Sequence, residues 1–207
     1  MGHTALASNT IGSLNTAVGY SSLTANTTGS HNSAFGTYAL NANTIGIYNT
    51  AIGRSALSVN IIGSANTAVG FQALEANTTS NNSAFGYKAL AVNTTGHRNA
   101  AFGFKSLITN TSGNYNVAMG HQTLFSNTIG DFNIAIGDEA LYSNTTGSRN
   151  TAVGRGALLY NTIGTDNSAF GMYALLQNTT GIYNSAFGRG ALQSNSSGGA
   201  NSAFGRM

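Results

Sequence analysis

A phrase of seventeen residues recurs along the whole chain, and this period constrains the fold more than any other feature of the sequence. The phrase begins with Asn-x-Ala, continues with an apolar residue and Gly, and contains a later Ala-Leu pair. Successive copies start seventeen residues apart, except that Asn66 and Asn82 are separated by sixteen. A short fixed period over an entire chain is typical of a solenoid, whose units bury their apolar side chains against their neighbours.

The unit is too short for a pair of helices, and it contains two Gly and several β-branched residues, which favours β structure. We therefore predict an all-β, parallel β-solenoid of about twelve 17-residue coils, either a β-roll or a β-helix, that forms one repeat domain over residues 1–207. Each coil is expected to contain two or three short strands that turn at the Gly residues. At about 4.8 Å per coil, the rod would be roughly 55 to 60 Å long.

Three columns of equivalent residues are predicted to face the interior. The first column is the apolar residue after each Asn-x-Ala and includes Val18, Phe35, Ile52, Val69 and Phe85. The second column is an unbroken row of Leu that includes Leu23, Leu40, Leu57, Leu74 and Leu90. The third column mixes Thr and Ile and includes Thr28, Ile45, Ile62 and Thr79. Small residues such as Ala17 are expected where the walls of a coil come close.

Two further columns consist of Asn, one represented by Asn15, Asn32 and Asn49 and the other by Asn26 and Asn43. Stacked side-chain amides can hydrogen-bond along a ladder and can satisfy the backbone of turns. The alternative function for Asn is glycosylation, because several Asn residues open N-x-S/T sequons. The sequons begin at Asn26, Asn77, Asn81, Asn93, Asn110, Asn144, Asn178 and Asn195.

Between the fixed columns lie pairs of residues that differ from coil to coil, and these pairs contain all of the charged residues and all of the Tyr. Variation confined to these positions predicts that they face solvent or a partner. The predicted contact surface comprises Tyr20, Tyr38, Arg54, Phe71, Tyr87 and Phe104. The partner would be a sister chain, a glycan or a cell surface, and the alternative is that these side chains only decorate the surface.

The composition argues against an enzyme. Only 6% of the residues are charged, Cys is absent, and the few acids and His are scattered, so no catalytic residues, metal ligands or cofactors are predicted. The net charge of +3 comes from eight dispersed cations and five acids, which does not favour a nucleic-acid binder. No apolar run is long enough for membrane insertion, and no signal peptide is visible. A recurring Thr, such as Thr27 or Thr44, suggests ice binding as a further alternative.

The phrases NTAVG, NSAFG and NTAIG, followed by x-x-A-L and NTTG, resemble the repeat arrays of phage and bacterial tail-fibre proteins. More distantly, they are similar to the head repeats of trimeric autotransporter adhesins. The resemblance implies a left-handed coil and a self-associating, often trimeric, fibre that is extracellular, on the cell surface or in a virion. The main functional hypothesis is therefore a structural fibre or filament, and the alternative is an adhesin or receptor-binding fibre segment.

The two ends of the chain are in phase with one another. The sequence enters the repeat at Ala5-Leu6 and ends just before the next Ala-Leu pair would come, so end-to-end stacking is predicted. The residues expected at this contact are Ala5, Leu6, Phe204, Arg206 and Met207.

Overall fold

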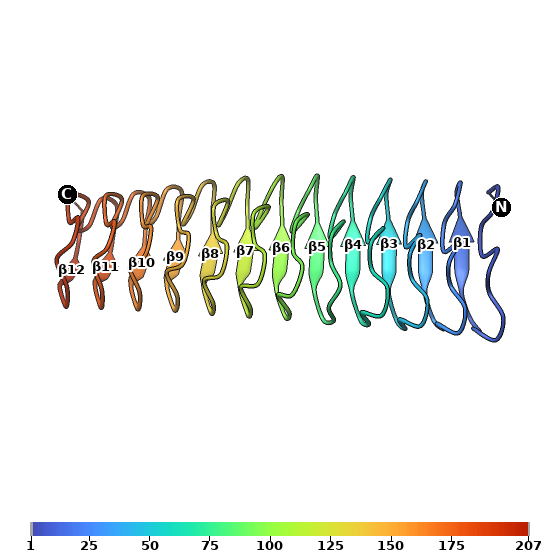
Figure 1. Cartoon of the computed structure of the whole chain (residues 1–207). Helices are drawn as coiled ribbons and strands as arrows, with labels where there is room; N and C mark the ends of the chain where they lie inside the picture. Colours follow the sequence, from blue (N-terminus) through green and yellow to red (C-terminus); the bar gives the residue numbers. More distant parts are fainter. Residues whose placement is uncertain (1, 207) are drawn as a thin grey trace.

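The computed structural model describes residues 2–206 and consists of a single straight stack of coils (Figure 1). It confirms an all-β parallel solenoid of about eleven turns of some seventeen residues, with no helix among the described residues. Each coil contributes one strand of three residues. The strands are β1 (Thr16–Val18), β2 (Ser33–Phe35), β3 (Thr50–Ile52), β4 (Thr67–Val69), β5 (Ser83–Phe85), β6 (Ala100–Phe102), β7 (Val117–Met119), β8 (Ile134–Ile136), β9 (Thr151–Val153), β10 (Ser168–Phe170), β11 (Ser185–Phe187) and β12 (Ser202–Phe204).

The twelve strands form one parallel sheet in sequence order, with equivalent residues paired. Ala17 pairs with Ala34, for example, and Val18 pairs with Phe35. Because side chains alternate across a strand, the central Ala of each strand points to one face and its two neighbours point to the other. The Ala face is the buried one: Ala34 and Ala51 are completely inaccessible to solvent.

The prediction for the first core column is therefore wrong. Val18, Phe35 and Ile52 are 45%, 41% and 43% exposed. Phe85 is also exposed, and Val69 is half-buried. The coil is narrow, and a Phe on the inner face of one strand would collide with the Leu row. The chain therefore puts Ala inside and the large apolar residue outside.

The third column is also on the outside, since Thr28 is exposed and Ile45 and Ile62 are among the exposed large hydrophobic residues. Thr79 is half-buried and not exposed, because in the sixteen-residue copy its backbone takes the place that a Gly has in the other coils. The Leu row is confirmed, and Leu23, Leu40, Leu57, Leu74 and Leu90 are all completely buried. The core thus consists of one Leu and two small residues per coil, flanked by the two Asn columns.

The two Asn columns are confirmed as ladders, and they converge on one carbonyl in each coil. Asn43 Nδ2 donates to Asn26 Oδ1 of the preceding coil at 2.8 Å and to Gly46 O at 3.1 Å. Asn32 Nδ2 donates to the same Gly46 O at 2.7 Å, and Asn15 Oδ1 accepts from the Asn32 backbone N–H. The backbone N–H of Asn49 donates to Asn32 Oδ1 in the same way and continues that column. A Cβ at Gly46 would lie 2.3 Å from Asn43 Oδ1, so only Gly fits beside the ladder.

The ladder has one break, and it lies at the sixteen-residue copy. There the carbonyl of Thr79 replaces the missing Gly carbonyl and accepts from both Asn66 and Asn77. The accepting carbonyl lies two residues after Asn77, whereas in regular coils it lies three residues after the ladder Asn, and Asn77 Nδ2 makes no bond to the preceding coil. Asn60 Oδ1 is left as the one buried side-chain polar atom without a hydrogen-bond partner among the described residues.

The expected second and third strands are replaced by turns with left-handed backbone. Every coil has a Leu with positive φ, such as Leu23 at 49° and Leu40 at 49°. Two further positions have positive φ in almost every coil. One is the residue two places before the Leu, such as Tyr38, and the other is the residue directly before each Asn-x-Ala, such as Tyr48. Left-handed residues cannot continue a strand, but their N–H groups still bond to the next coil or the preceding one, as from Leu23 to Ala39 O.

The predicted end contacts lie at opposite ends of the rod (Figure 1). Ala5 and Leu6 are half-buried in the first coil, Phe204 is 77% exposed in the last, and Arg206 is exposed. Met207 lies outside the described residues. The ladder runs in one direction, and apart from Asn77 each of its Asn residues donates to the preceding coil, as Asn26 does to Asn9 and Asn195 does to Asn178. End-to-end stacking stays a prediction.

Candidate functional site

The predicted contact residues lie on the surface, and five of the six belong to one column. This corner column is the residue after the Gly that ends each strand, and it contains Tyr20, Arg54, Phe71, Tyr87 and Phe104. Tyr38 is one place further along its coil, but its ring meets that of Tyr20 edge to face at a centroid distance of 5.5 Å. The structure therefore brings the predicted contact surface together along one edge of the rod.

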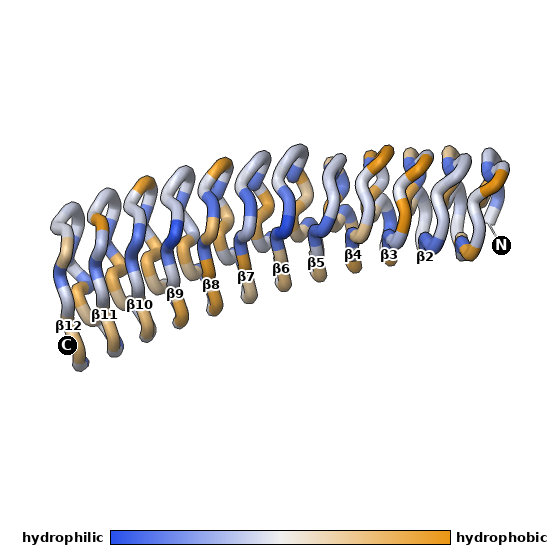
Figure 2. The backbone as a smooth tube through the Cα atoms, turned by 90° about the horizontal axis from the view of Figure 1, so that it is seen from below, coloured by the Kyte–Doolittle hydropathy of each residue, from blue (hydrophilic) through white to orange (hydrophobic). Residues whose placement is uncertain are grey.

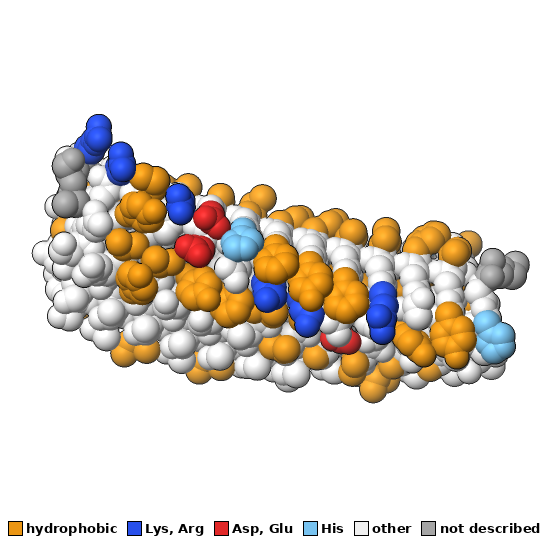
Figure 3. Space-filling view, turned by 90° about the horizontal axis from the view of Figure 1, so that it is seen from above, with side chains coloured by type: hydrophobic (Ala, Val, Ile, Leu, Met, Phe, Trp, Pro, Cys, Tyr) orange, Lys and Arg blue, Asp and Glu red, His pale blue; other side chains and the backbone are white. Residues whose placement is uncertain are grey.

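In the middle of the rod the corner column is a continuous stack. Arg54 lies 5.8 Å from the ring centroid of Phe71, and the rings of Phe71 and Tyr87 are stacked with centroids 5.4 Å apart. Phe104 stacks on Tyr87 at 5.3 Å, and the His121 ring stacks on Phe104 at 5.3 Å. Figure 3 shows hydrophobic, basic and His side chains following one another along the face seen from above.

Two Lys residues that the sequence analysis did not select belong to the same surface. Lys105 Nζ lies 5.1 Å from the ring centroid of Phe104, and Lys88 Nζ lies 5.7 Å from that of Tyr87. Their sequence signal is that each directly follows an aromatic residue of the corner column, in adjacent coils. Beyond His121 the column becomes ionic, since Asp138 contacts His121 at 3.1 Å and Arg155 at 3.5 Å.

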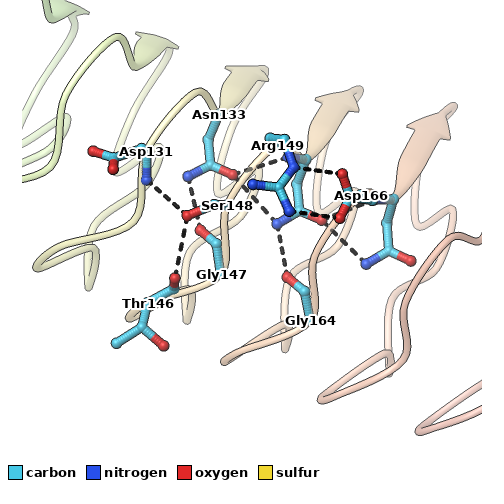
Figure 4. A network of polar contacts seen from close by, with 10 residues as sticks. Asp131, Asn133, Thr146, Gly147, Ser148, Arg149, Gly164 and Asp166 are labelled. Atoms are coloured by element: carbon cyan, nitrogen blue, oxygen red, sulfur yellow. Dashed lines mark hydrogen bonds and ion pairs between the residues drawn. The ribbon is translucent and has the colours of Figure 1, made fainter.

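A second outer column lies at the other end of each strand, at the residue before each Asn-x-Ala. Tyr115 and Phe132 stack there with centroids 4.8 Å apart, and Arg98 contacts the Tyr115 ring and hydroxyl. Further along, Arg149 makes a bidentate ion pair with Asp166, with Nε to Oδ1 at 2.6 Å and Nη2 to Oδ2 at 2.9 Å (Figure 4).

The ion pair shifts the pKa of both side chains. The hydrogen bond from Arg149 is the largest cause that lowers the pKa of Asp166, and the hydrogen bond to Asp166 likewise raises the pKa of Arg149. Figure 4 shows the pair beside the Asn133 and Gly164 part of the ladder. The pair is at the surface, with the Arg149 side chain 58% exposed, so it joins two coils without being a buried catalytic constellation.

A row of apolar residues lies on the outward face of the sheet. The outer apolar stripe is the residue after the central Ala of every strand: Val18, Phe35, Ile52, Val69, Phe85, Phe102, Met119, Ile136, Val153, Phe170, Phe187 and Phe204. Several of its rings stack between coils, as Phe85 does on Phe102 at 4.8 Å and Phe170 on Phe187 at 5.0 Å. Figure 2 shows hydrophobic residues recurring at equivalent places of successive coils.

Between the two ends of the described rod, the interior is filled by the buried Leu, Ala and Asn columns. Within residues 2–206 no group of three or more His, Asp or Glu is placed to hold a metal ion. The adjacent acids Asp138 and Glu139 do not form a facing carboxylate pair, since Asp138 turns to His121 and Arg155. No described helix is long and apolar enough to cross a membrane.

The sequons divide into two groups. Asn26, Asn77, Asn93, Asn110, Asn144 and Asn178 are completely buried ladder residues, and Asn195 donates its amide within the ladder. Asn81 alone lies exposed at a turn, in the sixteen-residue copy. The Thr column is part of the coil as well: Thr27 Oγ1 donates to Thr44 O at 3.1 Å. Ice binding stays a prediction, and its hydroxyl donors are already used between coils.

The chain is thus a repetitive β-solenoid that carries its charged and aromatic side chains on the outside. No family model matches the chain, and no curated protein or solved structure matches it.

Proposed function

We propose that this chain is a structural protein of an extracellular or virion fibre, and that its rods associate side by side through the outer apolar stripe. The single observation that carries the proposal is that this stripe runs from β1 to β12 and is exposed in nine of the twelve strands, with Val69, Phe102 and Val153 half-buried. Monomeric soluble proteins rarely expose a contiguous apolar patch of this extent, and such patches usually mark an interface.

The occupant of the stripe is a second copy of the same chain. The stripe is uniform in chemistry and repeats once per coil along the whole described rod, so a matching partner must be equally long and have the same period. A globular protein would cover only part of it. A second copy meets both conditions, and it can place its own apolar ridge beside the neighbouring row, which is mostly Thr and Ser, as at Thr50 and Ser83, and is apolar from Ala100 to Ile134.

The proposal is tested by the mass of the protein in solution. Sedimentation equilibrium of the unaltered chain should give a mass above that of the monomer, and Phe85→Ser with Phe102→Ser should return it toward the monomer. The matched control is Tyr115→Ser with Phe132→Ser, which removes another stacked pair with the same 4.8 Å centroid distance from the second outer column. The control should leave the mass unchanged.

Electron microscopy separates this association from end-to-end stacking. Rods that are thicker than one chain indicate side-by-side association, whereas thin rods much longer than about 60 Å indicate stacking of ends. A monomeric, unaltered chain at high concentration would overturn the proposal. A mass that falls equally in both double variants would show that the stripe is not the interface.

A further inference from the structure

The net charge of the protein is concentrated in one segment of the rod. Residues 54–105 contain four of the eight cations, namely Arg54, Lys88, Arg98 and Lys105, and one acid, Glu75. In the rest of the chain four cations balance four acids. This segment therefore carries the entire formal charge of +3.

Three of these cations lie in or directly beside the corner column, next to its aromatic rings. The basic ladder is defined as Arg54, Phe71, Tyr87, Lys88, Phe104 and Lys105. Its cation-to-ring distances are 5.1 to 5.8 Å. No salt bridge within residues 2–206 involves Arg54, Lys88 or Lys105, in contrast to Arg149 and Arg155. Their charged groups thus lie beside aromatic rings and are not neutralised by carboxylates.

The aromatic rings of the basic ladder stack face to face. Phe71, Tyr87 and Phe104 are nearly parallel, with interplanar angles of 12° and 11°. Tyr87 and Phe104 are 42% and 41% exposed. Since their faces are already stacked, they are not platforms for nucleobases, which single-stranded nucleic-acid binders need. The outward ring edges carry partial positive charge and therefore add to the attraction for anions.

We propose that the basic ladder binds a linear acidic polysaccharide that lies along the rod. Equivalent side chains recur at the coil rise of about 4.8 Å, which is comparable to the length of one sugar ring in an extended chain. A polyuronate places one carboxylate on each ring, so Lys88 and Lys105 can each meet an anion of the same chain. Gln72 and Gln122 border the two Lys residues in the same row, and they supply amides for sugar hydroxyls.

The test uses the full chain and a defined oligogalacturonate as the probe, with binding measured by titration calorimetry at low salt. The unaltered chain should bind, and raising the salt concentration should weaken binding. Lys88→Gln with Lys105→Gln should weaken it by about tenfold or more. The matched control is Arg98→Gln with Arg149→Gln, which removes the same net charge from the second outer column and should change the affinity less than about twofold.

Three results would overturn the inference. The first is the absence of oligogalacturonate binding by the unaltered chain. The second is an equal loss of affinity in both double variants, which would indicate attraction to the overall charge. The third is equal or tighter binding of a single-stranded oligonucleotide, which would assign the surface to nucleic acid. Circular dichroism of each variant establishes that it is folded, and neutral dextran should not bind. The result is independent of side-by-side association, since the outer apolar stripe is unaltered.

Discussion

Insertion of one Gly between Thr79 and Ser80 should repair the broken Asn ladder and stabilise the protein. In regular coils the ladder amide donates both to the Gly carbonyl three residues later and to the preceding coil, as Asn43 does. In the shortened coil Asn77 donates only to Thr79 O, and Asn60 Oδ1 is orphaned. The insertion restores the sequence Asn-Thr-Thr-Gly-Ser, so Asn77 regains the geometry of its equivalents.

The size of the effect follows from opposing contributions. Satisfying a buried acceptor is worth about 1–3 kcal/mol, and each restored backbone hydrogen bond adds roughly 1 kcal/mol. Ordering one more residue costs about 1–2 kcal/mol. The bond of 2.6 Å from Thr79 Oγ1 to Gly96 O is lost when Thr79 moves outward, which removes roughly 1 kcal/mol. With one restored backbone bond, we expect a net gain of about 0.5 kcal/mol in the free energy of unfolding.

Urea unfolding measures this gain as a higher midpoint at an unchanged slope. The control is insertion of a Gly after Gly96, in a coil whose ladder is complete, and there the extra residue should destabilise by about 1–2 kcal/mol. In the repaired protein the Asn77 side-chain amide protons should also exchange more slowly with solvent. The reasoning is refuted if both insertions lower the midpoint by the same amount.

Three further predictions test the local structure. Ala65→Gly should stabilise by a few tenths of a kcal/mol to about 1 kcal/mol, because Ala65 has φ of 56°. Ala76→Gly, at a residue without positive φ, should destabilise by about 0.5–1 kcal/mol, and thermal melting distinguishes the two signs. Ala118→Leu should cost about 1–3 kcal/mol by overpacking the inner face of β7, whereas Met119→Leu on the outer face should cost under about 0.5 kcal/mol in urea unfolding. Because the folded pKa of Asp166 is lowered, its stabilisation is present above the pKa of the unfolded state and is lost as the pH falls through the folded pKa. At about pH 6 the melting temperature of Asp166→Asn should therefore lie below that of the unaltered chain, and the difference should shrink as the pH falls through the folded pKa of Asp166.

The period, the parallel stacking, the Leu row and the Asn ladders could all be predicted from the sequence, because each follows from the identity of a repeated residue. Whether an apolar side chain faces the interior or the solvent could not be predicted from its apolar character alone. Phe35 and Leu40 are both large and apolar, yet one faces out and the other in. The better signal was the Ala between two larger residues, since only the narrow inner face requires a small side chain there.

The left-handed turns were missed for a related reason. Positive φ is usually indicated by Gly or Asn, but here a Leu adopts it in every coil. The burial of that Leu and the hydrogen bond from its N–H to the next coil outweigh the local cost, and neither interaction is visible within a single repeat. At the candidate site, five of the predicted residues fell in one column, while Lys88 and Lys105 emerged only from the contacts between adjacent coils.

The interactions of a typical coil connect residues seventeen positions apart, from the Asn ladder to the strand pairing. Duplication or loss of a whole repeat by unequal recombination would therefore recreate the same contacts at the new junction, and no compensating substitution would be needed. Loss of a single codon would instead leave a mismatched coil, such as the one that leaves Asn60 Oδ1 without a hydrogen-bond partner. The length of such a rod can thus change in genetic steps of seventeen codons while its cross-section stays constant.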